Sequence, residues 1–410
     1  MTAASPSATR IGSAIGELAS PPYTREGPGI TRYAYTDGYR STLEWFERAF
    51  RELGFEVWQD PVGTLVASNR APGEACFGVG SHCDSVRGGG AFDGTMGVVC
   101  ALEVCRLASE RGLDIGLRVI SFLEEEGSGF GQLLLGSRIV AQDVSDDELR
   151  SYVDEDGVTF VDAARLAGHE PERHREAAAV LDGLVGWIEM HIEQGRVLES
   201  EGLRLGIVDA IAGYVHADLV ITGRRDHAGA TPMDMRSDAG ITAAELVIEL
   251  EQLARESSPD TVATVGELSL EPGAINVIPA TARMSLDTRS VSGDHVRVAE
   301  RITDSARERA ARRGQTVHYS ERQRVAPTVL DAEVATALEE AARRAGVPAR
   351  RMHSAAAHDT MMVARRVPAA MVFVPCVDGV SHSPDEQADA EDGAIAAEVI
   401  LEAIRQLMPQ

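Results

Sequence analysis

Apolar residues along the first half of the chain follow two repeating patterns, which predict alternating strands and helices. Residues 76–80 and 117–123 are short apolar runs typical of buried strands, and residues 97–108 carry apolar side chains at helical spacing. Strands that alternate with helices favour an α/β fold with a mainly parallel sheet covered by helices on both faces. In such a sheet the ligand site lies beyond the carboxyl ends of the strands.

A different pattern begins near residue 214 and predicts a second domain. Four strand-like segments and two amphipathic helices follow one another in the order β-α-β-β-α-β, which is typical of a ferredoxin-like sandwich. They are the strands 215–222, 261–270, 280–289 and 316–320 and the helices 237–255 and 294–313. This order predicts an inserted domain over residues 212–324, within a first domain formed by residues 1–211 and 325–410.

The first pattern returns after the predicted insertion. Residues 331–345 and 391–407 have helical spacing, and residues 369–374 form another apolar run typical of a strand. The two parts of the first domain are therefore expected to fold together.

The composition fits a folded chain and disfavours several classes of partner. The chain has 410 residues, of which 44% are hydrophobic, so it can bury a sizeable core. Its net charge of −25 disfavours nucleic acid and anionic membranes as partners. We find no apolar run long enough to span a membrane and no signal-peptide pattern. Five cysteines without zinc-ribbon spacing favour reduced thiols in a cytoplasmic protein.

Candidate metal ligands follow the first apolar run. His82 and Asp84 come directly after residues 76–80, and Asp93 follows three glycines. A two-metal site holds its ions about 3.5–4 Å apart, so one carboxylate must bridge them, and Asp93 suits this role. Asp84 is spaced to orient the imidazole of His82 from outside the ligand shell. A lone His-x-Asp pair is more often a surface feature, and only the acidic residues further along favour a metal site.

Three adjacent glutamates at positions 124–126 end the second apolar run. A solvated run of charges is the ordinary explanation, but like charges at a strand end repel one another unless cations neutralise them. One carboxylate can bind a metal while its neighbour polarises a water molecule. Two later histidines in polar settings, His191 and His382, can complete the ligand set.

Several motifs occur together and in a specific order. They are Gly80-Ser-His-Cys-Asp-Ser-Val, Gly89-Gly-Ala-Phe-Asp-Gly, Glu124-Glu-Glu-Gly-Ser, His191-Ile-Glu-Gln-Gly, His227-Ala-Gly-Ala-Thr-Pro-Met, Gly273-Ala-Ile-Asn-Val-Ile-Pro, Leu286-Asp-Thr-Arg and Gly379-Val-Ser-His-Ser-Pro. Over nearly the whole chain they resemble the M20 metallopeptidase family. More narrowly, they resemble its amidase/carbamoylase branch of N-carbamoyl-L-amino-acid hydrolases, allantoate amidohydrolases and β-ureidopropionases.

The resemblance implies that Asp93 bridges two divalent metal ions, Zn²⁺ or Mn²⁺, with Co²⁺ or Ni²⁺ as alternatives. The other ligands would form two pairs, His82 with His191 and Glu126 with His382. Glu125 would be the general base. A histidine at position 191 marks the amidase/carbamoylase branch, because aminoacylase and dipeptidase relatives usually carry a carboxylate there.

The resemblance also implies that the inserted domain is a dimerisation lid, so that the protein is a homodimer. His227 would stabilise the oxyanion of a tetrahedral intermediate, and Asn276 and Arg289 would hold a substrate carboxylate, which suits the planar guanidinium. Gln194 would contact the carbamoyl or amide group of the substrate. From the residues alone, Arg289 is better explained by an ion pair at a strand end.

These implications lead to one main hypothesis and two alternatives. The main hypothesis is a hydrolase that cleaves a linear C–N amide of a small carboxylate-bearing substrate, most specifically the ureido group of an N-carbamoyl-L-amino acid or allantoate. An aminoacylase or dipeptidase of the same family is the second hypothesis, and a binding protein without turnover is the third. Gly129, Arg196 and Asp226 replace an arginine, a proline and an asparagine of the family pattern, which leaves the exact substrate open.

Overall fold

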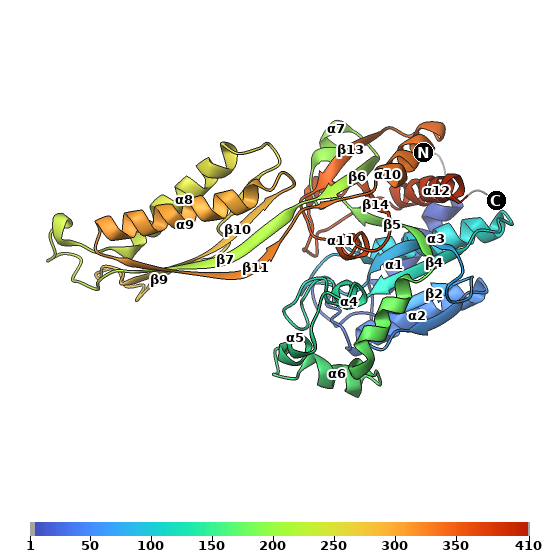
Figure 1. Ribbon diagram of the computed structural model, residues 1–410, viewed down its shortest axis with the longest axis horizontal. Helices are drawn as coiled ribbons and strands as arrows, with labels where there is room; N and C mark the ends of the chain where they lie inside the picture. The colour runs from blue at the N-terminus through green and yellow to red at the C-terminus, as the bar shows by residue number, and fades with distance from the viewer. Residues whose placement is uncertain (1–4, 409–410) are drawn as a thin grey trace. The chain divides into compact units, whose positions relative to one another are not determined.

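The chain folds as a mixed α/β protein with two β-sheets, in a computed structural model that describes residues 5–408 (Figure 1). Its residues group into two compact units. The first unit contains residues 5–209, 330–352 and 358–408, and the second contains residues 210–329 and 353–357. The second unit is therefore formed mainly by one continuous segment that interrupts the first.

The larger sheet has nine strands, and its central strands run parallel. The strands are β1 (Glu56–Gln59), β2 (Leu65–Ser68), β3 (Cys76–His82), β4 (Leu117–Phe122), β5 (Leu184–Ile192), β6 (Leu205–Ile211), β12 (Thr328–Val329), β13 (Ala349–Ser354) and β14 (Ala369–Val374). Their order is β1-β2-β4-β3-β5-β14-β6-β12, with β13 paired to β6. Parallel pairing joins β4 to β3, β3 to β5 and β5 to β14, and antiparallel pairs flank them on both sides. Every residue of β3 and β4 is buried, as expected of parallel strands covered on both faces.

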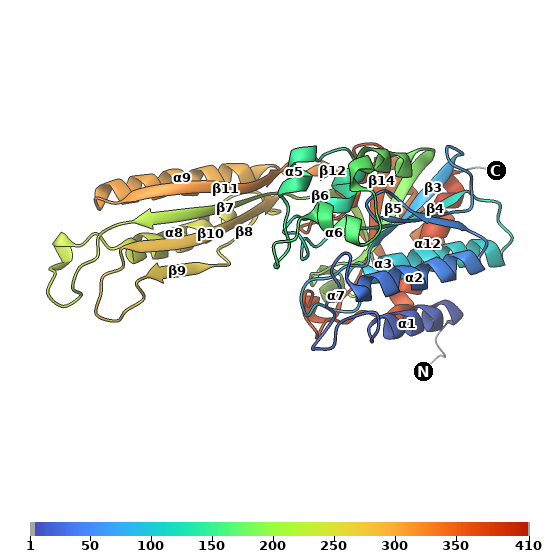
Figure 2. The same cartoon turned by 90° about the horizontal axis from the view of Figure 1, so that it is seen from below.

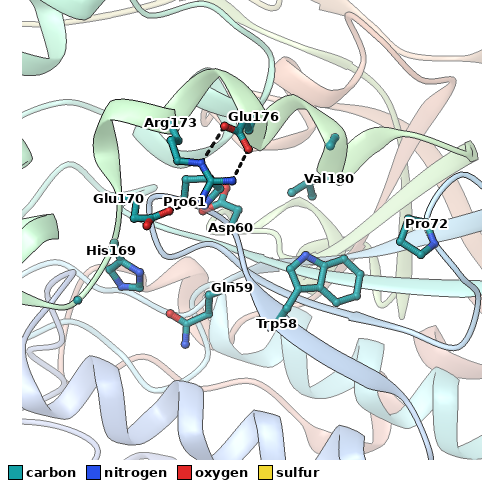
Figure 3. A pocket seen from close by; sticks show the side chains of 12 residues that line it. Trp58, Gln59, Asp60, Pro61, Pro72, His169, Glu170, Arg173, Glu176 and Val180 are labelled. Carbon is teal, nitrogen blue, oxygen red and sulfur yellow. Dashed lines mark hydrogen bonds and ion pairs between the residues drawn. The ribbon is translucent and has the colours of Figure 1, made fainter.

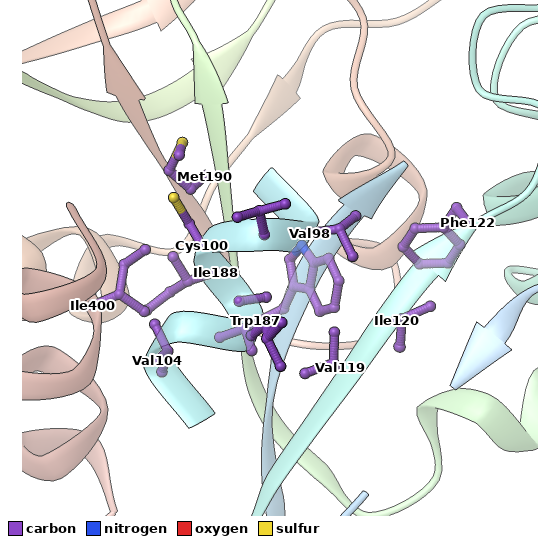
Figure 4. Packing of buried hydrophobic residues seen from close by; sticks show 14 of the residues in the cluster. Val98, Cys100, Val104, Val119, Ile120, Phe122, Trp187, Ile188, Met190 and Ile400 are labelled. Atoms are coloured by element: carbon purple, nitrogen blue, oxygen red, sulfur yellow. The ribbon is translucent and has the colours of Figure 1, made fainter. Parts of the chain in front are cut away.

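Helices of the first unit cover this sheet, and their apolar side chains pack against it to form the hydrophobic core. They are α1 (Pro6–Leu18), α2 (Asp37–Glu52), α3 (Thr95–Glu110), α4 (Leu135–Val140), α5 (Asp146–Ser151), α6 (Phe160–Leu166), η1 (Pro171–Leu181), α7 (Val197–Glu201), α10 (Ala332–Arg344), α11 (Thr360–Val363), η3 (Val377–Gly379) and α12 (Ala390–Leu407). Helix α3 is apolar on most of its faces and is buried along most of its length. In Figure 4, Val98 and Cys100 of α3 pack in one cluster with Trp187 of β5 and Ile400 of α12. No helix within residues 5–408 combines the length and apolar character needed to cross a membrane.

The second unit contains a separate antiparallel sheet and two long helices (Figure 2). Its elements are β7 (Gly213–Thr222), η2 (Met233–Met235), α8 (Ala239–Arg255), β8 (Val262–Thr264), β9 (Leu268–Glu271), β10 (Thr281–Ser290), α9 (Asp294–Arg312) and β11 (Thr316–Val325). The strand order is β11-β7-β10-β8, with β9 also paired to β10. Alternate residues of β10, including Met284 and Leu286, are buried in a cluster with Leu246 of α8 and Ile302 of α9. The period of two thus gives each strand one apolar face, which the helices cover.

The expected α/β class is confirmed, and the predicted helices and most predicted strands agree with observed elements to within one or two residues at their ends. Two strands of the second unit differ from the prediction. The predicted strand 261–270 is divided into β8 and β9, with Gly266 between them, and the backbone N–H of Ser285 in β10 donates to Glu267 in this interruption. The last strand continues beyond residue 320 to Val325, through a register shift after Glu321.

Candidate metal centre

The candidate ligands of the first unit follow the carboxyl ends of its four parallel strands. His82 is the last residue of β3, and His191 lies one residue before the end of β5. The glutamates at positions 124–126 follow β4, and the loop that carries His382 follows β14. Parallel strands present their carboxyl ends at one edge of a sheet, so residues far apart in the sequence converge there.

The side chain of Asp93 lies between two groups of candidate ligands. Its Oδ1 is 3.1 Å from Nε2 of His191 and 3.5 Å from Nε2 of His82. Its Oδ2 is 3.4 Å from Nε2 of His382, which is 3.5 Å from Oε2 of Glu126. Within each group the ligand atoms, one from each residue, lie within 4.8 Å of one another. The structure thus brings all five predicted metal ligands together, and one carboxylate belongs to both groups.

Backbone carbonyl groups determine the tautomer of each buried histidine, and so which ring nitrogen directs a lone pair toward Asp93. Nδ1 of His82 lies 3.2 Å from the carbonyl oxygen of Asp84, and Nδ1 of His191 lies 2.9 Å from that of Ile192. A carbonyl oxygen only accepts hydrogen bonds, so each Nδ1 carries the proton and each Nε2 presents its lone pair to the site. The N–H of Gly94 donates to Nε2 of His191 at 3.2 Å, which agrees with this tautomer.

Such an arrangement fits a bound cation. Lone pairs of imidazole repel a carboxylate at 3.1–3.5 Å unless a proton or a metal ion lies between them. Burial by itself lowers the pKa of His82, but Glu125 and the nearby aspartates outweigh it and raise that pKa well above its usual value. Imidazole nitrogens and carboxylate oxygens are ligands of divalent transition metals.

The neighbouring glutamates are buried acids close to other acids. Burial, together with the charge of Asp93, raises the pKa of Glu126 to about 8. Burial also raises the pKa of Glu125 well above its usual value. Oε1 of Glu126 is buried and accepts no hydrogen bond from any residue within 5–408. A divalent ion would reduce the repulsion between these carboxylates and would give Oε1 of Glu126 a partner.

The side chain of Asp84 binds the backbone of the glutamates and also lies beside the imidazole of His82. Its Oδ1 accepts the backbone N–H of Glu125 and its Oδ2 accepts that of Glu126, both at 3.1 Å. The same carboxylate lies 3.6 Å from Nδ1 of His82, and the carbonyl oxygen of Asp84 lies closer to that nitrogen, at 3.2 Å. The predicted orienting role of the Asp84 carboxylate stays a prediction. Oε2 of Glu125 then lies 3.7 Å from Nε2 of His82.

Two predicted residues of the second unit lie beside one another. Nδ1 of His227 accepts the backbone N–H groups of Gly229 and Ala230, both at 3.1 Å, so its Nε2 carries the proton. The His227 ring is exposed, and that N–H is therefore available to an acceptor. The N–H of Ala228 donates to the carbonyl of Asn276 at 3.0 Å, which brings the two segments together.

Arg289 makes the ion pair that the residues alone favour. Its Nε and Nη2 donate to the carboxylate of Asp287, and its Nη1 donates to the carbonyl of Ala355 at 3.0 Å. The guanidinium is about one-quarter exposed. Its predicted contact with a substrate carboxylate stays a prediction.

Comparisons with known proteins identify the family. The sequence matches the peptidase family M20/M25/M40 over residues 79–406. The chain belongs to this family. It is similar to the N-carbamoyl-L-amino-acid amidohydrolase of Paenarthrobacter aurescens, with 38% identity over 99% of this chain and 100% of the relative. It is also similar to a ureidoglycolate hydrolase of Oryza sativa subsp. japonica, with 36% identity over 93% of this chain and 81% of the relative.

A solved structure agrees with this assignment. An amidase of the hydantoinase/carbamoylase family from Burkholderia multivorans has a TM-score of 0.86 to this chain, with 30% identity and 98% of both chains covered. Together these relatives support the amidase/carbamoylase branch of the M20 family.

In this M20 chain the side chain of Gln194 contacts the shared carboxylate. Its Nε2 donates to Oδ2 of Asp93 at 2.8 Å, and its backbone has a positive φ of 58°. Its Oε1 is buried and has no hydrogen-bond partner within residues 5–408. The predicted substrate contact of Gln194 is not tested by this geometry, but the unpaired oxygen remains available for it.

Gly129, one of the departures from the M20 pattern, packs against a buried acid. Oε1 of Glu124 accepts the N–H groups of Gly129 at 2.6 Å and Phe130 at 2.7 Å. A Cβ at position 129 would lie 2.7 Å from Oε2 of Glu124. An arginine here would therefore require Glu124 to move.

Sequence reasoning missed two residues that contact Asp93. Oε1 of Glu386 accepts the backbone N–H of Asp93 at 3.0 Å, and Oγ of Ser381 lies 3.0 Å from Oδ2 of Asp93. Ser381 directly precedes His382, and Glu386 lies four residues after it. Nearness to a predicted ligand was therefore the one signal in the sequence for these two residues. An acid after a proline in a polar loop has the pattern of a solvated residue, so composition alone does not distinguish it.

A pocket of about 450 Å³ in the first unit contains none of the predicted site residues (Figure 3). Trp58 and His169 contribute to its lining, together with Arg173. The guanidinium of Arg173 binds Glu176 and Glu170, whereas the carboxylate of Asp60 accepts backbone N–H groups.

Proposed function

We propose that this chain is a metal-dependent amidohydrolase that cleaves linear C–N amides, specifically the ureido group of an N-carbamoyl-L-amino acid or of allantoate. The observation that carries the proposal is the carboxylate of Asp93, whose two oxygens face two different groups of ligands. Similarity to an N-carbamoyl-L-amino-acid amidohydrolase supports the substrate class.

Five residues of the first unit are proposed to hold two divalent ions. They are His82 and His191 on one side, Glu126 and His382 on the other, and Asp93 between them. Their donor atoms suit Zn²⁺ or Mn²⁺, with Co²⁺ or Ni²⁺ as alternatives. Ions bound there supply Lewis-acid chemistry, which polarises the substrate carbonyl and lowers the pKa of water.

Glu125 is the proposed general base. Its Oε2 lies beside the first ligand group, 3.7 Å from Nε2 of His82, and Asp84 fixes its backbone. Oε2 takes a proton from the attacking water as the new C–O bond forms. It then gives that proton to the leaving nitrogen as the C–N bond breaks.

The remaining proposed roles concern the substrate. His227 donates its Nε2 proton to the oxyanion of the tetrahedral intermediate, for which its tautomer is suitable. Asn276 and Arg289 bind the substrate carboxylate. Gln194 accepts a hydrogen bond from the carbamoyl nitrogen with its unpaired Oε1.

We further propose that residues 1–211 and 325–410 form the di-metal catalytic domain on the parallel strands, and that residues 212–324 form an inserted ferredoxin-like domain. The βαββαβ order and the strand order β11-β7-β10-β8 support the second assignment. Exposed apolar side chains on this unit, among them Met233, Ile248 and Leu268, favour its use as a dimer interface and lid. Light scattering on the purified protein tests the homodimer, and a monomer at micromolar concentration contradicts it.

The five cysteines are all buried and unpaired, which supports the proposed cytoplasmic location. Fractionation of the native cells with a tagged chain tests it. Recovery of the protein outside the cytoplasmic fraction contradicts the assignment.

A substrate panel tests the proposed activity. The metal-loaded protein is assayed with N-carbamoyl-L-amino acids, allantoate, ureidoglycolate, N-acetyl amino acids and dipeptides, and released ammonia and carbon dioxide are recorded. We expect turnover of ureido compounds. Preference for N-acetyl or peptide substrates, or no turnover of any amide with two ions bound, refutes the proposal.

A further inference from the structure

The two ends of the loop that carries His382 are hydrogen-bonded to one another, and His382 in its middle is exposed. The N–H of Val377 donates to the carbonyl of Gln387 at 2.8 Å, and Cys376 pairs with Ala388. Between these positions, the side chain of His382 is 50% exposed. The other four proposed ligands are nearly or fully buried. The second ligand group therefore depends on a histidine from an exposed loop.

Glu386 joins this loop to the loop that carries Asp93. Its Oε1 accepts the backbone N–H groups of Phe92 and Asp93, each at 3.0 Å. Its Oε2 lies 3.0 Å from Oγ of Ser381, whose single hydroxyl proton donates either to Glu386 or to Asp93. Only 3% of Glu386 is exposed, so these contacts are made away from water.

The same hydroxyl extends the contact to the shared ligand itself. Oγ of Ser381 lies 3.0 Å from Oδ2 of Asp93, the oxygen that faces His382. Gly90 leaves space for this connection, because a Cβ at that position would lie 2.1 Å from the carboxyl carbon of Glu386. The carboxylate of Glu386 thus fixes the backbone of Asp93, and the hydroxyl of Ser381 lies between the two carboxylates.

We propose that Glu386 is a positioning residue that holds the His382 loop against Asp93 and so sets the affinity of the second metal site. This inference rests on the proposed two-metal function. Its effect is directed at the ion bound by Asp93, Glu126 and His382, because Glu386 lies in the loop that carries His382 and its neighbour Ser381 contacts Oδ2 of Asp93, the oxygen that faces His382. The ion bound by His82 and His191 has ligands from rigid, buried strands and depends on Glu386 less.

Metal titration of the chelator-stripped protein tests the proposal independently of activity. Calorimetry with Zn²⁺ or Mn²⁺ gives two affinities for the wild type. Loss of a group that orients a metal ligand weakens metal binding by about 10- to 100-fold, and we expect this loss for one of the two ions in Glu386→Ala. In Glu386→Gln, Oε1 still accepts both backbone N–H groups, so we expect most of the affinity to return.

Asp60 provides a matched control. It is also a buried carboxylate that holds a loop, because its Oδ1 accepts the backbone N–H groups of Val62, Gly63 and Thr64. It contacts none of the proposed ligands. Asp60→Ala should lower the stability of the fold without changing either metal affinity.

The outcomes separate this proposal from the one on which it rests. If the wild type does not bind two ions, the proposed function is wrong. If it binds two ions and Glu386→Ala binds both with wild-type affinity, Glu386 has no positioning role. An equal loss in Asp60→Ala identifies a general effect of instability and also refutes it. Should Glu386→Ala not fold, Ser381→Ala decides, since weaker binding of one ion supports the proposal and unchanged binding overturns it.

Discussion

Replacing Glu125 by glutamine tests the proposed proton transfer with little change in shape. The amide has nearly the size of the carboxylate but does not take a proton from water. The backbone N–H of Glu125 is bound by Asp84, and the side chain is buried, so the glutamine should occupy the same place. Any loss of rate then reports the missing base.

The size of the effect follows from the position of Glu125 beside, but outside, the two ligand groups. Its Oε2 is 3.7 Å from Nε2 of His82, and it belongs to neither group of candidate ligands. Metal content and KM should therefore stay near wild type. A general base contributes about 10²- to 10⁴-fold to a rate. The expected fall in kcat corresponds to a barrier higher by about 3–5 kcal/mol.

Release of ammonia from an N-carbamoyl-L-amino acid measures kcat and KM, and elemental analysis measures the metal content of the same samples. Glu124→Gln is the matched control. It changes the adjacent buried glutamate, whose Oε1 binds backbone N–H groups that a glutamine oxygen can also accept. We expect a far smaller loss there. If Glu125→Gln keeps more than a tenth of wild-type kcat with two ions bound, Glu125 is not the base.

Four further predictions concern the metals, the oxyanion, the core and pH. Chelation should lower Tm, because an ion at 100 times its Kd stabilises the fold by about 2.7 kcal/mol; an unchanged thermal melt contradicts bound metal. His227→Gln should reduce kcat by about 10²- to 10³-fold at constant metal content, and wild-type turnover would exclude an oxyanion role. The fully buried Arg32 donates to the carbonyl of Cys83 and the hydroxyl of Thr95. Arg32→Met leaves them unpaired and should cost at least about 3 kcal/mol in urea unfolding; a loss below 1 kcal/mol contradicts this. Burial raises the pKa of Asp60 to about 6, so its contribution to stability is present at low pH and is lost as pH rises through that value. The stability of Asp60→Asn relative to wild type should therefore increase by about 2.4 kcal/mol between pH 4 and pH 7, and equal pH profiles would refute the shift.

Most elements and some of the ligands have local signals in the sequence, whereas His191 and His382 were assigned through the family resemblance. The apolar run 76–80 marks a strand with two covered faces, and His82 directly after it lies at the end of that strand. The glycines on both sides of Asp93 indicate that other groups approach the backbone closely there. Gly94 has a positive φ of 56°, and a Cβ there would lie 2.3 Å from the ring of His82.

Other parts of the site depend on contacts between distant segments, which leave no local pattern. Glu386 acts on Asp93 across nearly 300 positions, and its neighbours in the sequence give it the character of a surface acid. Asp84 was expected to orient the imidazole of His82, and its carboxylate also accepts the N–H groups that follow β4, which the sequence did not indicate. The interruption between β8 and β9 is likewise set by Ser285 on the adjacent strand.

The order of the large sheet determines when the proposed centre can form during synthesis. Strand β14 lies between β5 and β6, although both of those strands leave the ribosome long before it. Until β14 emerges, the nascent sheet has a gap beside β5, and the chain still lacks His382. A complete ligand set therefore exists only after residue 382 has been synthesised. Truncated products that end before β14 cannot assemble it, and their unpaired strand edges make them targets for chaperones or proteases.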